Sequence, residues 1–193
     1  AVSCCLLAAC TSSRELRPDD VRVERILLAS DFELARVSDG VWIHTTFTEL
    51  PGGGPFPSNG LIIEGADGVV VVDTPWTPKA TKTLLEWVET RLHKPVTDVI
   101  VTHSHDDRTA GVAELAPTTK IHALQKTVEF AAAQGRTFTA EPLQPTEQLT
   151  LGGVKLTTFF PGAGHAPDNI VVMLPTQRVL FGGCFIKSAA ASD

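Results

Sequence analysis

Residues 101–108 read Val101-Thr102-His103-Ser104-His105-Asp106-Asp107-Arg108 and stand between two segments of different pattern. The apolar run at 99–101 before them predicts a short buried strand. Residues 109–116 after them carry apolar side chains at helical spacing and predict a helix. The two histidines therefore lie on a loop between a strand and a helix, where polar side chains converge without being buried in the core.

His103, His105 and the aspartates that follow them offer the donor atoms that zinc prefers. Zinc takes histidine nitrogen at about 2.0–2.1 Å and aspartate oxygen at about 2.0–2.2 Å. In a competing interpretation, Asp106 and Asp107 only cap the helix and the histidines are ordinary loop residues. Residues further along the chain bear on this choice.

The composition is typical of a folded globular domain. The 193 residues suffice for one domain, with 43% hydrophobic and 20% charged residues. The formal net charge of −6 leaves no basic surface of the kind that binds nucleic acid. We therefore expect no nucleic-acid partner.

Three of the four cysteines, Cys4, Cys5 and Cys10, stand within the first ten residues, which read AVSCCLLAAC. Residues 1–10 resemble the end of a bacterial lipoprotein signal, in which Cys10 would be lipidated and would attach a periplasmic protein to the membrane. An ordinary secretory signal or a chance apolar patch are the alternatives. Either way Cys184 keeps no partner in the mature chain, and metal ligation would explain an unpaired thiol.

The chain after the signal divides into an N-terminal lead at 11–31 and one domain at 32–193. Asp39-Gly40 and Asp67-Gly68 predict hairpins that join strands 32–37 to 41–47 and 61–64 to 69–72. Between these hairpins, residues 51–60 (PGGGPFPSNG) predict a loop, either a simple connection or a mobile flap with Phe56 and Pro57 exposed at its tip.

The second half of the chain alternates helices and strands. Thr77-Pro78 predicts the start of an amphipathic helix that runs to residue 92. We further predict a strand at 120–123, a helix at 125–134, a hairpin of 148–151 with 154–160, and strands at 170–174 and 179–181. This order predicts helices outside two sheets, and the absence of GxGxxG argues against a Rossmann sheet.

Two further residues with metal-binding side chains stand next to predicted strands. His165 lies in a glycine-rich turn, 162–169, and Cys184 follows Gly182-Gly183. Alone, His165 would be a loop histidine and Cys184 a small core residue. Together with His103, His105 and Asp107 they form a set that packing does not explain.

These motifs resemble the B1 metallo-β-lactamases. The resemblance rests on three segments: His103-Ser-His105-Asp-Asp107-Arg108, Gly164-His165-Ala-Pro-Asp-Asn169 and Gly182-Gly183-Cys184-Phe-Ile-Lys187. It extends from about Val41 to Lys187. It implies an α/β fold, the αββα sandwich of two mixed sheets with external helices, with the metals in a groove at one sheet edge.

The resemblance also implies roles for individual residues. His103, His105 and His165 would bind one zinc ion, and Asp107 and Cys184 a second. Zinc lowers the pKa of a bound water toward about 7, and a second metal stabilises charge on a leaving group. Asp107 would pass a proton to the departing β-lactam nitrogen, and Lys187 would pair with the substrate carboxylate.

Other residues would support these groups. Arg108 would hold the region of the Cys184 thiolate by charge. Asp73 and Thr102 would orient the ligands from behind. The flap residues Phe56 and Pro57, together with Trp76, would form the apolar wall of the substrate groove.

The family also has a histidine ligand to the second zinc and a substrate-binding asparagine beyond the position of Lys187, and neither occurs before Asp193. We therefore expect a C-terminally truncated piece of a monomeric enzyme, poorly active by itself, whose parent binds two zinc ions. The parent would hydrolyse penicillins, cephalosporins or carbapenems and confer antibiotic resistance.

Two alternatives remain. The first is another hydrolase of the same fold, such as a thioesterase or a glyoxalase II-like enzyme. Many relatives of that type have histidine and aspartate where this chain has Arg108 and Cys184, which argues against it. The second is a lipid-anchored zinc-binding protein without catalytic activity.

Overall fold

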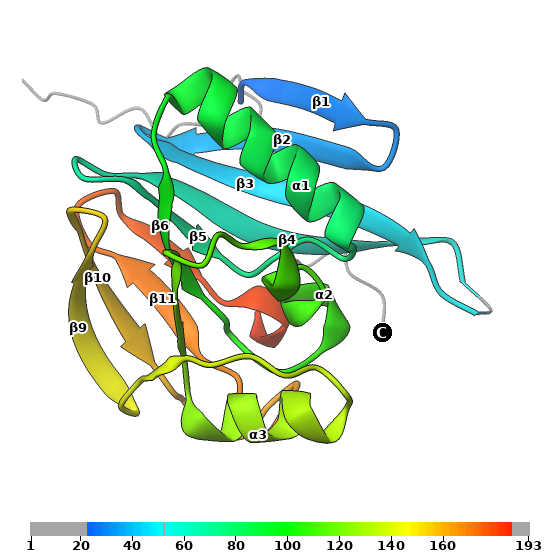
Figure 1. Ribbon diagram of the computed structural model, residues 1–193, viewed down its shortest axis with the longest axis vertical. Helices are drawn as coiled ribbons and strands as arrows, with labels where there is room; N and C mark the ends of the chain where they lie inside the picture. Colours follow the sequence, from blue (N-terminus) through cyan, green and yellow to red (C-terminus); the bar gives the residue numbers. More distant parts are fainter. Residues whose placement is uncertain (1–22, 52, 187–193) are drawn as a thin grey trace, which may run out of the picture.

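The computed structural model describes residues 23–51 and 53–186, in which two β-sheets pack face to face (Figure 1). In these residues the first sheet has eight strands in sequence order: β1 (Arg25–Ala29), β2 (Phe32–Ser38), β3 (Val41–Glu49), β4 (Pro55–Glu64), β5 (Val69–Val72), β6 (Val96–Ile100), β7 (Lys120–Ala123) and β8 (Glu141–Pro142). The second, within the same ranges, has four strands in the order β12 (Val179–Phe181), β11 (Val171–Leu174), β10 (Val154–Phe159) and β9 (Thr146–Leu151). Cys10 and Lys187 lie outside the described residues.

Strand direction follows from the length of the connections. Strands β1 to β5 are antiparallel and joined by turns, whereas β5 to β8 are parallel. Parallel neighbours need a crossover. The crossovers contain α1 (Pro78–Trp87) with the π-helical turn η2 (Val88–Leu92), α2 (Asp106–Thr109) with the 3-10 turn η3 (Val112–Glu114), and α3 (Gln125–Ala133). The eight-stranded sheet is therefore mixed, while the four-stranded sheet is antiparallel throughout.

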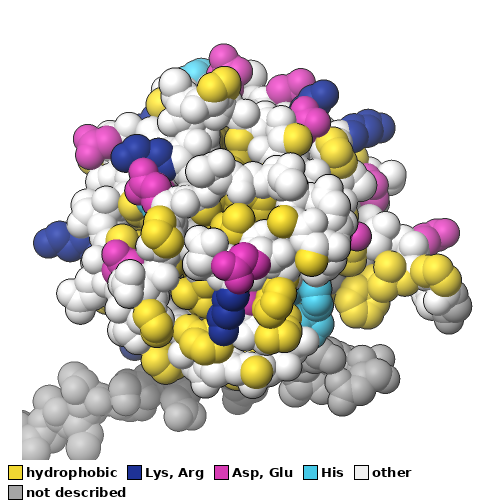
Figure 2. Space-filling model, turned by 60° about the horizontal axis from the view of Figure 1, so that its bottom comes forward, with side chains coloured by type: hydrophobic (Ala, Val, Ile, Leu, Met, Phe, Trp, Pro, Cys, Tyr) yellow, Lys and Arg dark blue, Asp and Glu magenta, His cyan; other side chains and the backbone are white. Residues whose placement is uncertain are grey.

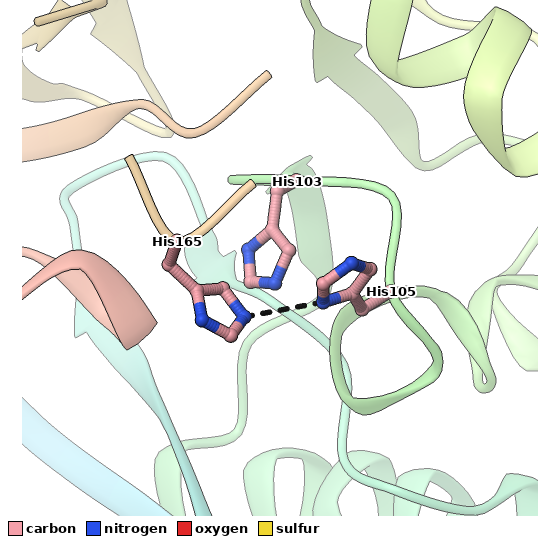
Figure 3. Close-up of side chains that lie close together, drawn as sticks. All are labelled: His103, His105 and His165. Atoms are coloured by element: carbon pink, nitrogen blue, oxygen red, sulfur yellow. Dashed lines mark hydrogen bonds between the residues drawn. The ribbon is translucent and has the colours of Figure 1, made fainter. Parts of the chain in front are cut away.

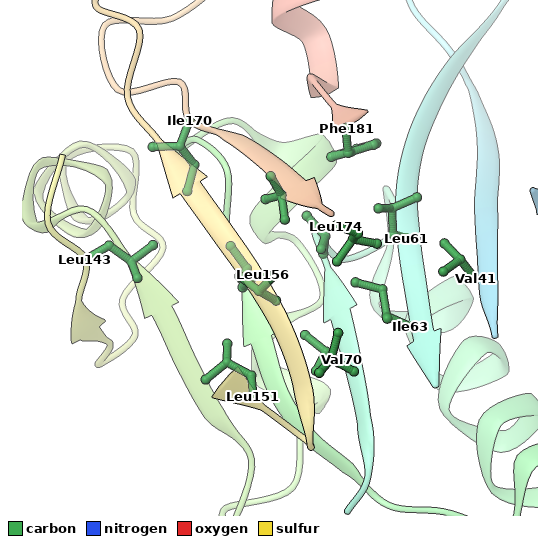
Figure 4. Packing of buried hydrophobic residues seen from close by; sticks show 14 of the residues in the cluster. Val41, Leu61, Ile63, Val70, Leu143, Leu151, Leu156, Ile170, Leu174 and Phe181 are labelled. Atoms are coloured by element: carbon green, nitrogen blue, oxygen red, sulfur yellow. The ribbon is translucent and has the colours of Figure 1, made fainter. Parts of the chain in front are cut away.

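The core lies between the two sheets, where alternate residues of each strand point inward (Figure 4). Leu61, Ile63 and Val70 of the first sheet face Leu156 and Leu174 of the second, and all five are buried. This close packing fixes the distance between the sheets, and with it the separation of the loops that leave them at one edge.

A second apolar cluster joins α1 to the outer face of the eight-stranded sheet, which α1 crosses in Figure 1. Leu84 and Trp87 of α1 are buried, and the Trp87 ring meets Trp42 of β3 edge to face at 5.3 Å. The Thr77 hydroxyl caps the helix by accepting a hydrogen bond from the Ala80 amide (3.1 Å), as predicted. No helix within residues 23–51 and 53–186 is long and apolar enough to cross a membrane.

The loop predicted at 51–60 is wrong for its second half, because β4 begins at Pro55. Pro55 to Gly60 pair with β3, but β5 pairs with β4 only from Leu61 onward. Among residues 23–51 and 53–186, one side of this stretch therefore has no neighbouring strand. Prolines at 55 and 57 are tolerated there, because a strand with a free side needs no second row of amide donors.

The helix predicted at 109–116 is also wrong, since α2 ends at Thr109 and only the turn η3 follows. The Gly111 amide donates to the Thr74 hydroxyl (3.0 Å) instead of to a helix carbonyl. A side chain at Gly111 would collide with Thr81 of α1. Close packing of Gly111 on α1 therefore replaces the helical hydrogen bonds that the sequence pattern predicted here.

Two boundaries also differ from the sequence predictions. The sheet starts at Arg25, inside the segment taken as a lead at 11–31, and β1 pairs with β2 through Arg25 and Ala35. The helix predicted to reach residue 92 is α-helical only to Trp87, and η2 continues to Leu92, where His93 with its left-handed backbone (φ 54°) ends it. The helix predicted at 125–134 is confirmed as α3.

Candidate metal centre

The three histidines predicted as ligands converge at one edge of the sheets (Figure 3). His103 and His105 lie between β6 and α2, and His165 lies between β10 and β11. Their ring centroids are 4.7 Å (His103–His105), 5.2 Å (His103–His165) and 5.0 Å (His105–His165) apart. His105 Nδ1 is 3.2 Å from His165 Nε2. The structure thus brings together residues 60 positions apart in the sequence.

The cluster is buried at one end and open at the other. His103 is buried, His105 is half-buried and His165 is exposed. Figure 2 shows histidine side chains at the surface beside hydrophobic ones. A small molecule can therefore reach the exposed side, while the buried side keeps its geometry through protein contacts.

The groups behind His103 set the direction of its ring. Its Nδ1 is 3.3 Å from the Thr102 hydroxyl and 3.3 Å from the Asn169 amide nitrogen. Thr102 donates its hydroxyl proton to Asp73 Oδ2 (2.7 Å), so its oxygen can accept from a protonated Nδ1, whereas the Asn169 amide would donate to an unprotonated one. Both partners hold the Nδ1 side of the ring and leave Nε2 on the side away from them. Burial, followed by the charge of Arg108, lowers the pKa of His103 to about 2, so the ring is neutral.

Asp107 and Cys184 lie on the other side of His103. Asp107 Oδ1 is 3.9 Å from His103 Nε2, and Asp107 Oδ2 accepts from the Cys184 thiol at 3.5 Å. The Ser58 hydroxyl also donates to Asp107 Oδ2 (3.3 Å). Burial raises the pKa of Cys184, against the lowering effect of Arg108. His103 is therefore shared between a histidine group and a carboxylate–thiol group.

Arg108 is fully buried beneath this second group. Its Nη2 donates to Cys184 Sγ (2.8 Å) and lies 3.0 Å from Asp107 Oδ2, and its Nη1 is 3.3 Å from Asp73 Oδ2. Nη1 also donates to the Asn59 carbonyl. Burial alone would lower the pKa of Arg108, but Asp73, Asp107 and Cys184 together raise it. The guanidinium thus places a fixed positive charge below the thiol and the carboxylate.

Asp73 follows β5 with a left-handed backbone (φ 63°), an unusual conformation for a residue other than glycine. This bend aims its carboxylate at the next loop, where Oδ1 accepts from the Thr102 amide at 2.7 Å. Burial raises the pKa of Asp73 to about 7, although Arg108 and the two Thr102 hydrogen bonds oppose the shift. Asp73 and Thr102 therefore lie directly behind His103, and their role in orienting the ligands stays a prediction.

The structure places three of the residues predicted to contact substrate but does not test that contact. Phe56 and Pro57 are exposed on β4, and Trp76 is half-buried after β5. Phe56 shares a strand face with Ser58, the residue that reaches Asp107. Substrate contact by Phe56, Pro57 and Trp76 stays a prediction. Lys187 lies outside the described residues.

Three supporting residues were not predicted from the sequence: Ser58, Asn169 and Arg136. Asn169 accepts from the Ala166 amide (2.9 Å) and reaches His103. Arg136, after α3, contacts the loop that carries His103 and His105. A polar residue beside a ligand motif could have indicated Asn169. Arg136 carries no such signal, because only the fold brings it to the loop.

Because His44 on β3 is buried, we expect the protein to lose stability as the pH falls. Its Nε2 is 3.0 Å from the Asp73 carbonyl oxygen, and burial lowers its pKa from 6.5 to about 4. The unfolded chain gains a proton below pH 6.5, but the native state gains it only near pH 4. Stability is therefore lost as the pH falls through this window, by up to roughly 3 kcal/mol.

Urea unfolding of the metal-free protein between pH 7 and pH 4 measures this effect. His44→Gln still donates to the carbonyl but does not titrate, so its stability should fall less with pH than that of the unsubstituted protein. The contribution of Asp73 is common to both proteins and cancels in the difference. Equal pH slopes for the two proteins would contradict the assignment.

The residues present fit a zinc ion. The nitrogen donors of His103, His105 and His165 lie within 4.8 Å of one another, and so do the ligand atoms of His103, Asp107 and Cys184. His103 Nε2 is buried and has no hydrogen-bond partner within the described residues. Burying a polar atom without a partner is costly, and a metal would supply one. Imidazole nitrogen, thiolate and carboxylate are the usual zinc ligands.

Known proteins resemble the chain in sequence and structure. The family model described as Metallo-beta-lactamase superfamily matches residues 53–190. Metallo-beta-lactamase type 2 from Bacillus sp. (strain 170) is 40% identical over 176 residues, which cover 89% of this chain and 68% of that protein. The chain spans about two thirds of the length of the curated relatives it matches.

Solved structures agree with these relatives. A metallo-beta-lactamase from Pontibacter korlensis aligns with a TM-score of 0.78 and 35% identity, covering 83% of this chain and 74% of that chain. The metallo-beta-lactamase FIM-1 from Pseudomonas aeruginosa, solved in its mono-zinc form, aligns with a TM-score of 0.76 and 34% identity, covering 86% and 75%. The fold predicted from the ligand motifs is confirmed, and the chain belongs to the metallo-β-lactamase superfamily.

Proposed function

We propose that the protein hydrolyses the amide bond of β-lactams with zinc held by His103, His105, His165, Asp107 and Cys184. The observation that carries the proposal is the position of His103, which belongs to both groups of candidate ligands and whose buried Nε2 has no hydrogen-bond partner among the described residues. The names of the relatives supply the substrate class. The mono-zinc form of one relative supports at least one metal here.

The proposed division of labour follows the geometry. The histidine group would hold one ion and the Asp107–Cys184 group a second. Zinc at such a site activates water for attack on a carbonyl and stabilises the negative charge that develops. The open side, at His165, admits the substrate, while His103 and Asp107 are buried and exclude water from behind.

Asp107 would transfer a proton, and Arg108 would stabilise negative charge. Asp107 Oδ2 accepts hydrogen bonds from Ser58 and Cys184, which orient the carboxylate, and Asp107 would pass a proton to the departing nitrogen. Arg108 would stabilise Cys184 as a thiolate, since its Nη2 donates to the sulfur at 2.8 Å. Lys187 would pair with the substrate carboxylate. In the cell, we propose a periplasmic location and an anchor at Cys10.

Nitrocefin hydrolysis tests the proposal. The purified chain with added zinc should hydrolyse nitrocefin at least tenfold faster than the same protein with a chelator, on the order expected for a metal that activates water. Added zinc should restore the lost rate. A thioester substrate serves as the control for other hydrolases of this fold, and hydrolysis of the thioester but not of nitrocefin would contradict the proposal.

A further inference from the structure

Arg136 lies just after α3, and the turn that ends this helix fixes its position. Gly135 has a left-handed backbone (φ 83°), and the Arg136 amide donates to the Ala131 carbonyl (2.9 Å). This is the usual way for a helix to end at glycine. The turn directs the Arg136 side chain back across the loop between β6 and α2. Only 20% of that side chain is exposed.

The guanidinium of Arg136 contacts residues on both sides of His105. Before it, Nη2 donates to the Ser104 carbonyl (2.8 Å). After it, Nη1 pairs with the Asp106 carboxylate. Nε donates to the Thr109 hydroxyl (2.8 Å), which donates in turn to the His105 carbonyl (2.9 Å). Arg136 Nη2 also contacts Gln134 Oε1 (2.5 Å), which holds the fork in place.

Within the part of the chain that the structure describes, the other groups of the site do not fix His105 as they fix His103. His103 is buried and has Thr102 and Asn169 at its Nδ1, whereas His105 is half-buried and its ring lies against His165, a residue of another loop. The backbone on either side of His105 is instead held by Arg136. A histidine on a loop can ligate a metal only if that loop keeps its place.

We propose that Arg136 is a positioning residue for the metal centre, which holds His105 where it can ligate zinc. The inference rests on the proposed metal site. A planar fork with three donor edges can make these contacts together, whereas a lysine offers one point charge. Removal of residues that support metal ligands typically lowers metal affinity by about 10- to 100-fold.

Two readouts on Arg136→Gln test the proposal in the full chain. Zinc affinity, measured by competition with a chromophoric chelator, should fall by about 10- to 100-fold. In the metal-free protein, hydrogen exchange at the Arg108 and Thr109 amides, which both donate to the His105 carbonyl, should become at least about tenfold faster. Arg136→Lys should recover only a minor part of either loss.

The controls separate positioning from general stability. Arg25→Gln removes an exposed ion pair with Glu33 (2.8 Å) and should leave zinc affinity and loop exchange unchanged. Thr109→Val removes the contact that joins Arg136 Nε to the His105 carbonyl and leaves the Ser104 and Asp106 contacts in place. It should shift both readouts in the same direction, so it decides the matter if Arg136→Gln does not fold.

The proposal is overturned if Arg136→Gln lowers the unfolding temperature while zinc affinity and loop exchange stay at their original values. If the unsubstituted chain binds no zinc, the proposed function fails instead. The exchange of the loop amides in the metal-free protein then still decides the role of Arg136.

Discussion

Replacement of His103 by alanine should lower zinc affinity on the order of 10³-fold and reduce nitrocefin hydrolysis to background. His103 is one of the three histidines proposed to hold the first ion, and its buried Nε2 has no hydrogen-bond partner among the described residues, so its loss removes a central ligand. Structural zinc sites bind with about 10–16 kcal/mol from four ligands, and each 1.4 kcal/mol is tenfold in affinity. The loss of one central ligand therefore reaches several kcal/mol. Chelator competition measures the affinity directly.

The matched control is His93→Asn, which removes an exposed imidazole outside the site. His93 has a left-handed backbone (φ 54°), and asparagine tolerates this conformation well. Zinc affinity of this variant should equal that of the unsubstituted chain. A similar loss in both variants would mean that histidines bind zinc without regard to their place in the fold.

Replacement of Arg108 by methionine should destabilise the metal-free protein by about 3–5 kcal/mol at pH 8, because it leaves buried carboxylates without their partner. Arg108 Nη1 and Nη2 lie 3.3 Å from Asp73 and 3.0 Å from Asp107. Methionine roughly keeps the apolar volume of the stem but supplies neither charge nor donor. Urea unfolding measures the difference.

The pH dependence of this loss identifies its cause. Arg108 lowers the pKa of Asp73, which burial raises to about 7, so without Arg108 that pKa rises further. At pH 5 Asp73 is protonated and no longer needs a positive partner. The loss of stability in Arg108→Met should therefore be smaller at pH 5 than at pH 8. Arg25→Met, which breaks an exposed pair with Glu33, should cost at most about 1 kcal/mol at either pH. A loss that does not change with pH would point to packing instead of charge.

Much of the fold could be predicted because local chemistry and the final structure agree. Strands joined at Asp39-Gly40 and Asp67-Gly68 form as expected, and Thr77 caps α1. The exceptions have tertiary causes. Pro55 and Pro57 lie in a strand because β3 pairs with one side of it, while no described strand pairs with the other side. Gly111 stands outside a helix because it packs on Thr81.

In the candidate site too, some residues could be predicted from local sequence, while others come together only through the fold. The sequence predicted that His103, His105, His165, Asp107 and Cys184 come together at strand ends, and the structure places them together, while ligation itself stays a prediction. Arg108 was predicted to lie by the thiol and does so at 2.8 Å. Arg136 could not be predicted, because its contacts arise where the turn after α3 meets the loop between β6 and α2 and not from any local pattern.

Anomalous diffraction at the zinc absorption edge, on crystals grown with zinc, tests the central claim most directly. We predict a peak at about 2.0–2.1 Å from the donor nitrogens of His103, His105 and His165, with any second peak beside Asp107 and Cys184. A map in which zinc binds elsewhere on the chain, with these side chains free of metal, would contradict the account.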